Sequence, residues 1–269
     1  MTPRPHVRLL NAFDLTTNGR SVALPMSAQR VLAFVALHDR PVQRPYIAGS
    51  LWLETPDERA HANLRSALWR LHNCGLRLVD ATSAQLCLAR HVRVDLRESE
   101  TLARETLDAT NEGHDVPAAA FSGDVLPDWY DDWVILERER YRQLRLRALD
   151  ALCDRLTLEG RLGAALEAGL AAVASDPLRE SAHRSVIRVH LAEGNIGEAI
   201  RQYRLCRRLL HDQLGIEPSE RIEQLMGGVL DVETVRGDTD RRRMRSRKAA
   251  AMASSRQSTP GSSESVTRA

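Results

Sequence analysis

The residues of this chain best suited to binding chemistry lie between Thr55 and Gly75, where arginines and one indole recur at helical spacing. Projected at about 100° per residue, the stretch places cationic, small and aromatic side chains on one face of a helix. Guanidinium groups bind base edges and phosphate oxygens, so this face has the chemistry to enter a DNA major groove. Taken alone, the stretch is more typical of a solvated amphipathic helix. The face holds Arg59, Ala62, Arg65, Ser66 and Trp69, with His61 and Arg70 on its flanks.

The same stretch has the signals of a helix with defined ends. Thr55 is a candidate N-cap, Pro56 fits the first helical position, and Glu58 would complete a capping box. Gly75 can adopt the left-handed conformation that ends a helix. We therefore expect one amphipathic helix with a buried back and an exposed basic front. The apolar back consists of Ala60, Leu64, Ala67, Leu68 and Leu71.

Short elements on both sides of this helix predict a small β component. Asn18-Gly19 is a strong signal for a two-residue hairpin turn. Two helices are expected next, the first capped by Ser27 and the second starting at Pro45. A second hairpin, with a polar tip, follows the basic helix. The predicted strands are Val7–Leu10, Ala12–Thr16, Ser21–Leu24, Leu76–Asp80 and Leu86–His91.

This order of elements, a sheet, three helices and a hairpin, is that of a winged helix with an extra N-terminal sheet. In such a domain the third helix enters the major groove, and the hairpin lies along the backbone or in the minor groove. The charge agrees with this prediction. Residues 1–95 contain 12 arginines and 7 acidic residues, whereas residues 96–235 contain 17 arginines and 26 acidic residues. The basic segment favours a polyanion as partner, and the acidic segment favours a protein.

A sequence repeat marks the acidic segment as helical. Gly160 recurs as Gly194, and neighbouring residues match at the same offset of 34. This is the tetratricopeptide period, in which glycine stands at the turn between two helices. Stacks of this kind usually bind protein, and a helical spacer without a partner is the alternative. The matching pairs are Leu162 with Ile196, Gly163 with Gly197, Ala165 with Ala199, and Leu166 with Ile200.

A long helix is expected ahead of the repeat, from Asp128 to about Leu158. Trp129 and Trp133 lie one turn apart in it and are more typical of core anchors than of ligand contacts. Two repeat units fall below the three or so that a stable stack needs. The helices before and after the repeat must therefore complete it.

The sequence argues against several classes of protein. The motifs GxGxxG, GxSxG and HExxH are absent, and the one lysine, Lys248, lies in the C-terminal tail. The cysteines are scattered and predict reduced thiols of a cytoplasmic protein. No apolar run approaches the roughly 18 residues of a membrane span. We expect no enzyme activity, no catalytic residue, no cofactor, no metal ion and no membrane partner.

The predicted fold is mainly α with a small β component. A winged helix-turn-helix is expected over residues 1–95 and an all-helical tetratricopeptide-like domain over residues 96–235. Residues 236–269 combine a basic run with serine-rich sequence, a composition that predicts a disordered tail.

Over about residues 6–230 the chain resembles one known family, and the resemblance is specific in four places. The chain is similar to the SARP, or AfsR-type, activators, which combine an OmpR-like winged helix with a bacterial transcriptional activator domain. The family tends to have a small residue where Trp69 stands. The similar stretches are Val7–Leu10, Ala62–Leu71, Phe121–Pro127, Tyr130–Trp133, Glu137–Arg140 and Leu214–Ser219.

The resemblance implies a DNA-binding activator of antibiotic or other secondary-metabolite biosynthetic genes. Family members bind direct repeats in promoter double-stranded DNA as paired protomers or homodimers and engage RNA polymerase and its sigma factor there. The implied location is cytoplasmic and nucleoid-associated. A helical-repeat adaptor whose winged helix docks protein rather than DNA is the alternative.

The predicted DNA contacts come from the basic helix and from the second hairpin. Arg59 and Arg65 would reach bases or phosphates, and one bidentate arginine–guanine pair discriminates by about 1–3 kcal/mol. Trp69 would either stack on a sugar or a thymine methyl group, or fold against the hairpin. Asn63, Ser66 and Arg70 would support the register, and Thr82, Ser83, Gln85 and Arg90 of the hairpin would contact the backbone.

Overall fold

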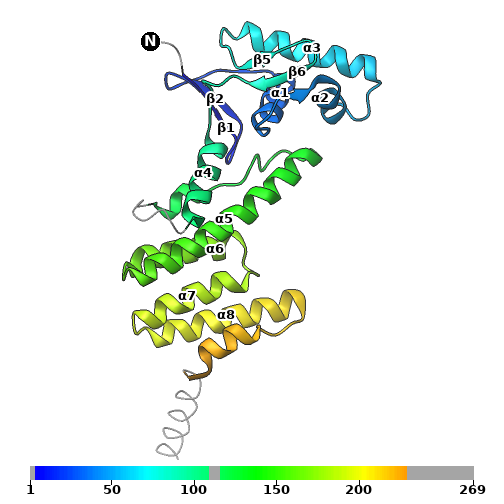
Figure 1. The fold of residues 1–269 in the computed structure, drawn as a ribbon. Helices are drawn as coiled ribbons and strands as arrows, with labels where there is room; N and C mark the ends of the chain where they lie inside the picture. Colours follow the sequence, from blue (N-terminus) through cyan, green and yellow to red (C-terminus); the bar gives the residue numbers. More distant parts are fainter. Residues whose placement is uncertain (1–3, 109–115, 229–269) are drawn as a thin grey trace, which may run out of the picture.

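The computed structural model describes residues 4–108 and 116–228, in which a winged helix is followed by a stack of helices. Figure 1 shows the winged helix at one end of the molecule and the last helices of the stack toward the other end. The predicted fold class, mainly helical with a small β component, is confirmed. The domain boundaries at residues 95 and 235 stay predictions, and the tail predicted over 236–269 lies outside the described residues.

A four-stranded sheet opens the fold. It consists of β1 (Pro5–Arg8), β2 (Asp14–Thr17), β3 (Arg20–Ser21) and β7 (Arg93–Val94), in the order β3-β2-β1-β7. The predicted turn at Asn18-Gly19 is confirmed, because both residues have the positive φ that this hairpin needs, 50° and 76°. Strand β7 was not predicted. It runs parallel to β1, with Val7 opposite Val94.

Three helices and a second sheet complete the winged helix. The helices are α1 (Met26–Ala36), α2 (Arg44–Leu51) and α3 (Asp57–Asn73). The predicted hairpin is confirmed with shorter strands, β5 (Val79–Ala81) and β6 (Gln85–Leu88), and β4 (Val42–Gln43) pairs with β6. We call the β5–β6 hairpin the wing. Strand β4 was not predicted, since two residues are too few to show an alternating pattern.

Helices α3 and α1 do not have the N-caps that the sequence predicted. The N–H group of Thr55 bonds to the carbonyl of Trp52 at 3.0 Å, so Thr55 belongs to the preceding turn and Pro56 is the N-cap of α3. No side-chain hydrogen bond caps α3, and the predicted capping box is therefore wrong. Helix α1 likewise has Pro25 as its N-cap, and Ser27 lies inside its first turn.

Helix α5 (Asp132–Leu158) begins at Asp132 rather than at the predicted Asp128. A guanidinium group holds the preceding residues in an irregular loop, where Leu126 has a φ of 43°. Arg138, one turn and a half into α5, bonds back to three carbonyl groups of this loop. The acceptors are the carbonyl oxygens of Val125 at 2.8 Å, of Leu126, and of Trp129 at 2.9 Å.

The two tryptophans of this region are anchors in the core, as predicted. The ring of Trp129 stacks on Phe13, with the ring centres 5.9 Å apart. Trp133 meets Phe34 of α1 edge-on at 5.2 Å. Buried residues of α5 belong to the same hydrophobic cluster as those of the winged helix. The start of the helical stack is thus continuous with the core of the winged helix.

The 34-residue repeat is confirmed in the helical stack. Helices α6 (Leu162–Ser175) and α8 (Ile196–Leu214) begin 34 residues apart, and the turn glycines Gly160 and Gly194 both have a φ of 75°. Helix α7 (Glu180–Ala192) lies between them. A Cβ atom at Gly169 would approach Val186 to 2.8 Å, so α6 and α7 pack closely there. Helix α4 (Asp95–Leu107) and a 3-10 turn (Ala118–Phe121) precede the repeat, and residues 220–228 are again helical.

Within the two described ranges, no helix combines the length and the apolar character that crossing a membrane requires.

His183 of α7 is fully buried and has a partner for each ring nitrogen. Its Nε2 lies 2.9 Å from the carbonyl oxygen of Pro177, which can only accept, so Nε2 is the donor. Its Nδ1 then accepts from the amide of Gln202 at 2.8 Å. Burial lowers the pKa of His183, opposed by the hydrogen bond to Pro177. The ring is therefore held in its neutral form.

Replacing Arg138 by methionine tests the guanidinium bonds to the loop. The variant leaves three carbonyls without their donor, and hydrogen bonds to charged groups contribute about 1.5–3 kcal/mol each before solvent exposure reduces them. We expect Arg138→Met to lower the free energy of unfolding by about 2–4 kcal/mol, measured by urea denaturation. The control is Arg147→Met, which alters an exposed arginine of the same helix. Equal stability of the two variants would contradict the assignment.

The buried His183 makes stability depend on pH. Because its folded pKa is lowered, the unfolded chain binds the extra proton first, and stability falls as pH drops below the ordinary histidine value of about 6.5. Between pH 7.5 and 5.5 this contribution is at most about 1.4 kcal/mol, the limit for a ring that stays neutral in the folded state. We expect His183→Gln to flatten the pH profile of unfolding by up to that amount, whereas His211→Gln, at an exposed site, should keep the wild-type slope. A wild-type slope in both variants would exclude His183 as the source.

Candidate nucleic-acid interface

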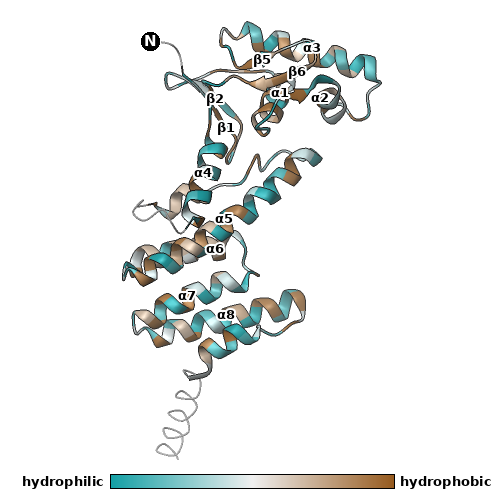
Figure 2. Cartoon of the chain, viewed as in Figure 1, coloured by the Kyte–Doolittle hydropathy of each residue, from teal (hydrophilic) through white to brown (hydrophobic). Residues whose placement is uncertain are grey.

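Helix α3 presents a long exposed face because its opposite face is buried. Ala60, Leu64, Ala67 and Leu71 are each at most 3% exposed and pack in the winged-helix core, and Leu68 is half-buried. Hydrophilic and hydrophobic residues alternate along α3 in Figure 2, as expected for such a helix. Gly75 follows its end with a φ of 78°, as predicted. Figure 1 places α3 on the outer side of the winged helix, away from α7 and α8.

The predicted contact residues of α3 differ in how free their side chains are. Arg59 and Arg65 are exposed, and neither has a hydrogen-bond or ion-pair partner among the residues that the structure describes. The hydroxyl of exposed Ser66 donates to the carbonyl of Ala62 at 3.0 Å, so it is occupied by its own helix. Arg70 donates to the hydroxyl of Ser27 in α1 at 2.8 Å, which ties α3 to α1. Asn63 is partly buried.

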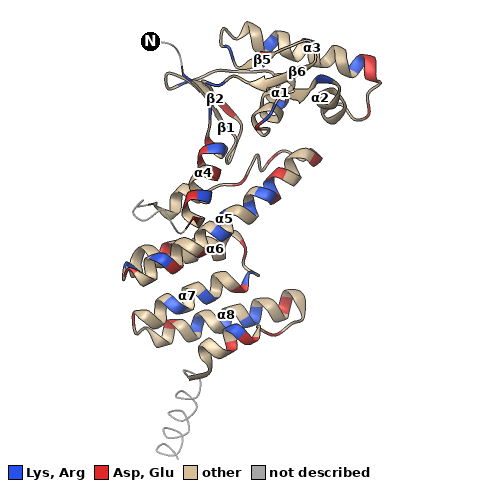
Figure 3. Ribbon diagram, viewed as in Figure 1, with Lys and Arg blue, Asp and Glu red and all other residues tan. Residues whose placement is uncertain are grey.

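The charges along α3 distinguish its two free arginines. Asp57 and Glu58 occupy the first turn, and Figure 3 shows acidic residues at this end of the helix. Arg59 therefore lies in the same helical turn as two carboxylates. Arg65 lies nearly two turns further along, at 1.5 Å per residue, where α3 has no acidic residue. Arg65 is thus the better placed of the two to meet the acceptor edge of a base.

Trp69 lies on the exposed face and is 65% accessible. It lines a hollow of about 840 Å³ between α3 and β5, together with Arg44, His72 and Arg77. We call this the recognition hollow. An indole folded against the wing would be shielded, so the free protein has the more exposed of the two predicted arrangements.

The predicted wing residues divide into those that build the tip and those that remain free. The hydroxyl of Thr82 accepts from the N–H of Gln85 at 3.0 Å and of Ala84 at 3.3 Å, so it stabilises the turn. Gln85 is paired in the ladder between β6 and β4. Ser83 and Arg90 are exposed and have no polar side-chain partner within the described part of the chain. Ser83 and Arg90 are therefore the two exposed ones that can reach an outside ligand without breaking a bond.

Two basic residues of the interface were missed by sequence reasoning. Arg44 donates its backbone N–H to Ala84 and its Nε to the carbonyl of Thr82, both at 2.9 Å, and so fixes the wing tip to the start of α2. Arg77 donates to Asp80 at 2.7 Å, and its side chain is 76% exposed. Arg44 is positioned by the pairing of β4 with β6, which joins residues about forty positions apart. No local sequence pattern indicates such a pairing.

Comparisons with known proteins agree with the resemblance seen in the sequence. A family model described as "Bacterial transcriptional activator domain" matches residues 88–230, more than half of the chain. Regulatory protein AfsR of Streptomyces coelicolor is 24% identical over 229 residues, which cover 80% of this chain and 23% of AfsR. This chain therefore spans less than a quarter of that relative.

Among solved structures, Mycobacterium tuberculosis EmbR, in complex with a low-affinity phosphopeptide, is similar with a TM-score of 0.66 and 21% identity. The likeness covers 85% of this chain and 65% of the EmbR chain. At this identity it shows a shared fold, with a winged N-terminal region followed by a helical domain.

Comparing wild type with Trp69→Phe isolates the fluorescence of this one indole. Because Trp69 is 65% exposed, we expect the emission lost in the variant to be red-shifted and strongly quenched by acrylamide in the free protein. The emission lost in Trp129→Phe should instead be blue-shifted and weakly quenched, since the ring of Trp129 is partly buried against Phe13. A shielded Trp69 signal in free protein would instead place the indole against the wing.

Proposed function

This chain belongs to the bacterial transcriptional activator domain family and is a regulator of the SARP type, and we propose that it is a sequence-specific DNA-binding transcription activator. Helix α3 would enter the major groove with Arg65 at its centre, and the wing would lie against the backbone. The proposal assigns the protein no catalytic role. It also places the protein in the cytoplasm, associated with the nucleoid.

The partner-free guanidinium of Arg65 is the observation on which the proposal rests. Arg65 has no ion pair among the described residues and lies on the exposed face of α3, whose opposite face is buried in the core. All the N–H donors of its guanidinium group can therefore point toward a ligand. The bidentate geometry of its donors matches the O6 and N7 atoms of guanine. Trp69, one turn further along the same face, would then contact a sugar or a thymine methyl group.

Contacts to phosphate groups would set the position of α3 in the groove. Arg90 and Ser83 of the wing region are exposed and free to donate. Arg44, already bonded to the wing tip, supplies a fixed positive charge between α2 and the wing. Such contacts orient a protein on the duplex without specifying its sequence.

The helical stack is the part of the chain suited to protein partners. We propose that it engages RNA polymerase or its sigma factor, and that two protomers bind direct repeats at promoters of a secondary-metabolite gene cluster. The support is the acidic balance of residues 96–235 and the stacked repeat, an architecture that commonly presents a binding surface. Assigning protein contact to the stack leaves the winged helix for DNA.

Replacing Arg65 by alanine tests the proposal. Duplexes would first be selected from a random library with the wild-type chain, and affinities then measured by electrophoretic shift. We expect Arg65→Ala to weaken binding to the selected duplex by roughly 5- to 150-fold, which corresponds to about 1–3 kcal/mol, and to relax the preference at one base pair. The control is Arg147→Ala, at an exposed arginine of α5. If Arg65→Ala binds the selected duplex as tightly as the control, Arg65 does not contact a base.

A further inference from the structure

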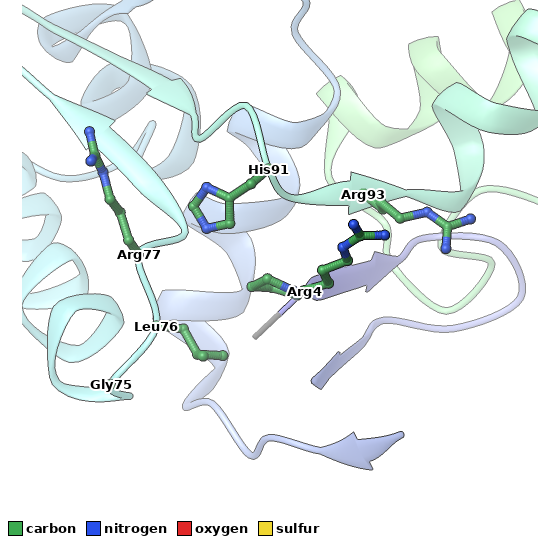
Figure 4. Close-up of a pocket in the computed structure, with 7 residues that line it drawn as sticks. Arg4, Gly75, Leu76, Arg77, His91 and Arg93 are labelled. Atoms are coloured by element: carbon green, nitrogen blue, oxygen red, sulfur yellow. The ribbon is translucent and has the colours of Figure 1, made fainter. Parts of the chain in front are cut away.

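A second hollow, of about 690 Å³, lies beside the recognition hollow and is strongly basic. Three segments meet there: the start of β1, the turn after α3, and the stretch that leads from β6 into β7. Figure 4 shows His91 between Arg77 on one side and Arg4 and Arg93 on the other. Among the described residues that line it, none is acidic. The lining residues are Arg4, Pro5, Gly75, Leu76, Arg77, His91 and Arg93.

Nearby carboxylates neutralise only part of this charge. Arg93 is held by both oxygens of Glu98, at 2.7 and 3.0 Å, and Arg77 is bonded to Asp80 through Nε alone. Within the described ranges, Arg4 has no hydrogen-bond or ion-pair partner. Three guanidinium groups around one hollow repel each other, and an anion placed among them removes that repulsion.

The chemistry of the lining fits a phosphate group. Guanidinium N–H groups form paired hydrogen bonds with phosphate oxygens, and the planar fork of arginine matches them better than an ammonium group would. The volume of the hollow is within the usual range of about 300–1,000 Å³ for small-ligand sites. Pro5 and Leu76 add apolar surface beside the charged groups. The site therefore has room for more than a bare ion.

The hollow is continuous with the proposed DNA-contacting surface. Gly75, Leu76 and Arg77 line both this hollow and the recognition hollow that contains Trp69. A basic surface thus extends from the front of α3, past Arg77, to Arg4 and His91. A DNA strand that leaves the major groove at the C-terminal end of α3 would bring its backbone toward this surface.

We propose that this second hollow is a phosphate-binding site, filled by the backbone of DNA that flanks the major-groove contact or by a free phosphorylated small molecule. The first source rests on the proposed function, and the second does not. Both sources require the same donors. Arg4 and His91 are the two of them that have no hydrogen-bond or ion-pair partner among the described residues. Arg4→Gln/His91→Gln removes these donors and leaves the ion pairs of Arg77 and Arg93 in place.

The first measurement uses the free protein and needs no DNA. Sodium pyrophosphate is titrated into the full chain at constant ionic strength, and backbone amide shifts are followed by NMR. We expect shifts confined to Gly75, Leu76, Arg77 and His91. They should disappear in Arg4→Gln/His91→Gln and persist in Arg20→Gln, which removes an arginine from β3 at the far edge of the same sheet. A dispersed amide spectrum verifies that each variant is folded.

The second measurement compares the salt dependence of DNA binding for the same variants. Each phosphate contact contributes about 0.9 to the slope of log Kobs against log salt. If DNA supplies the phosphate, Arg4→Gln/His91→Gln reduces the slope by about 1 or 2 relative to Arg20→Gln, with the base preference unchanged. If a free molecule supplies it, only the pyrophosphate shifts respond.

The proposal is overturned if neither measurement separates Arg4→Gln/His91→Gln from Arg20→Gln. Failure of the proposed function has a different signature. In that case the wild-type chain selects no duplex, while the pyrophosphate titration still decides whether the hollow binds phosphate.

Discussion

One guanidinium group holds the loop that joins the winged helix to the helical stack. Arg138 of α5 bonds to three carbonyls of the loop before that helix, and this loop enters the core of the winged helix. Its conformation brings Trp129 onto Phe13 and Trp133 onto Phe34, and it places Asp131 against Arg30 of α1. Buried polar groups left without partners are costly, so these bonds hold the loop in one conformation. The winged helix and the start of the stack therefore behave as one packed unit.

Through this connection, the core that supports α3 is continuous with the start of the stack. The buried face of α3 is packed in the winged-helix core, and Arg70 ties this helix to Ser27. The exposed face then combines a free guanidinium at Arg65 with a half-open hollow that contains Trp69. Figure 3 shows acidic and basic residues on both the winged helix and the stack, and the sequence counts give the winged helix a basic excess and the stack an acidic one. The proposed function thereby places nucleic-acid contact and protein contact at different ends of the molecule.

Patterns that are local in sequence predicted most of the fold. The spacing of Ala60, Leu64 and Leu71 identified the buried face of α3, and the glycines at 160 and 194 identified the repeat. Most of what the sequence did not predict depends on individual contacts that no repeating pattern signals. Strands β4 and β7 have two residues each and exist because β6 and β1 supply their partners. The bonds from Arg44 to the wing tip and from Arg138 to the loop likewise have no local signal. The capping box failed because Thr55 was already engaged in the preceding turn.

The most direct test of the central claim is the affinity of the full chain for a selected duplex and for a scrambled duplex over a series of salt concentrations. If α3 contacts bases in the major groove, the selected duplex should bind more tightly by about a thousandfold or more. Affinity should also fall steeply with salt, because phosphate contacts release counterions. Equal affinity for the two duplexes, or binding that salt leaves unchanged, would contradict the claim and favour a winged helix that docks protein.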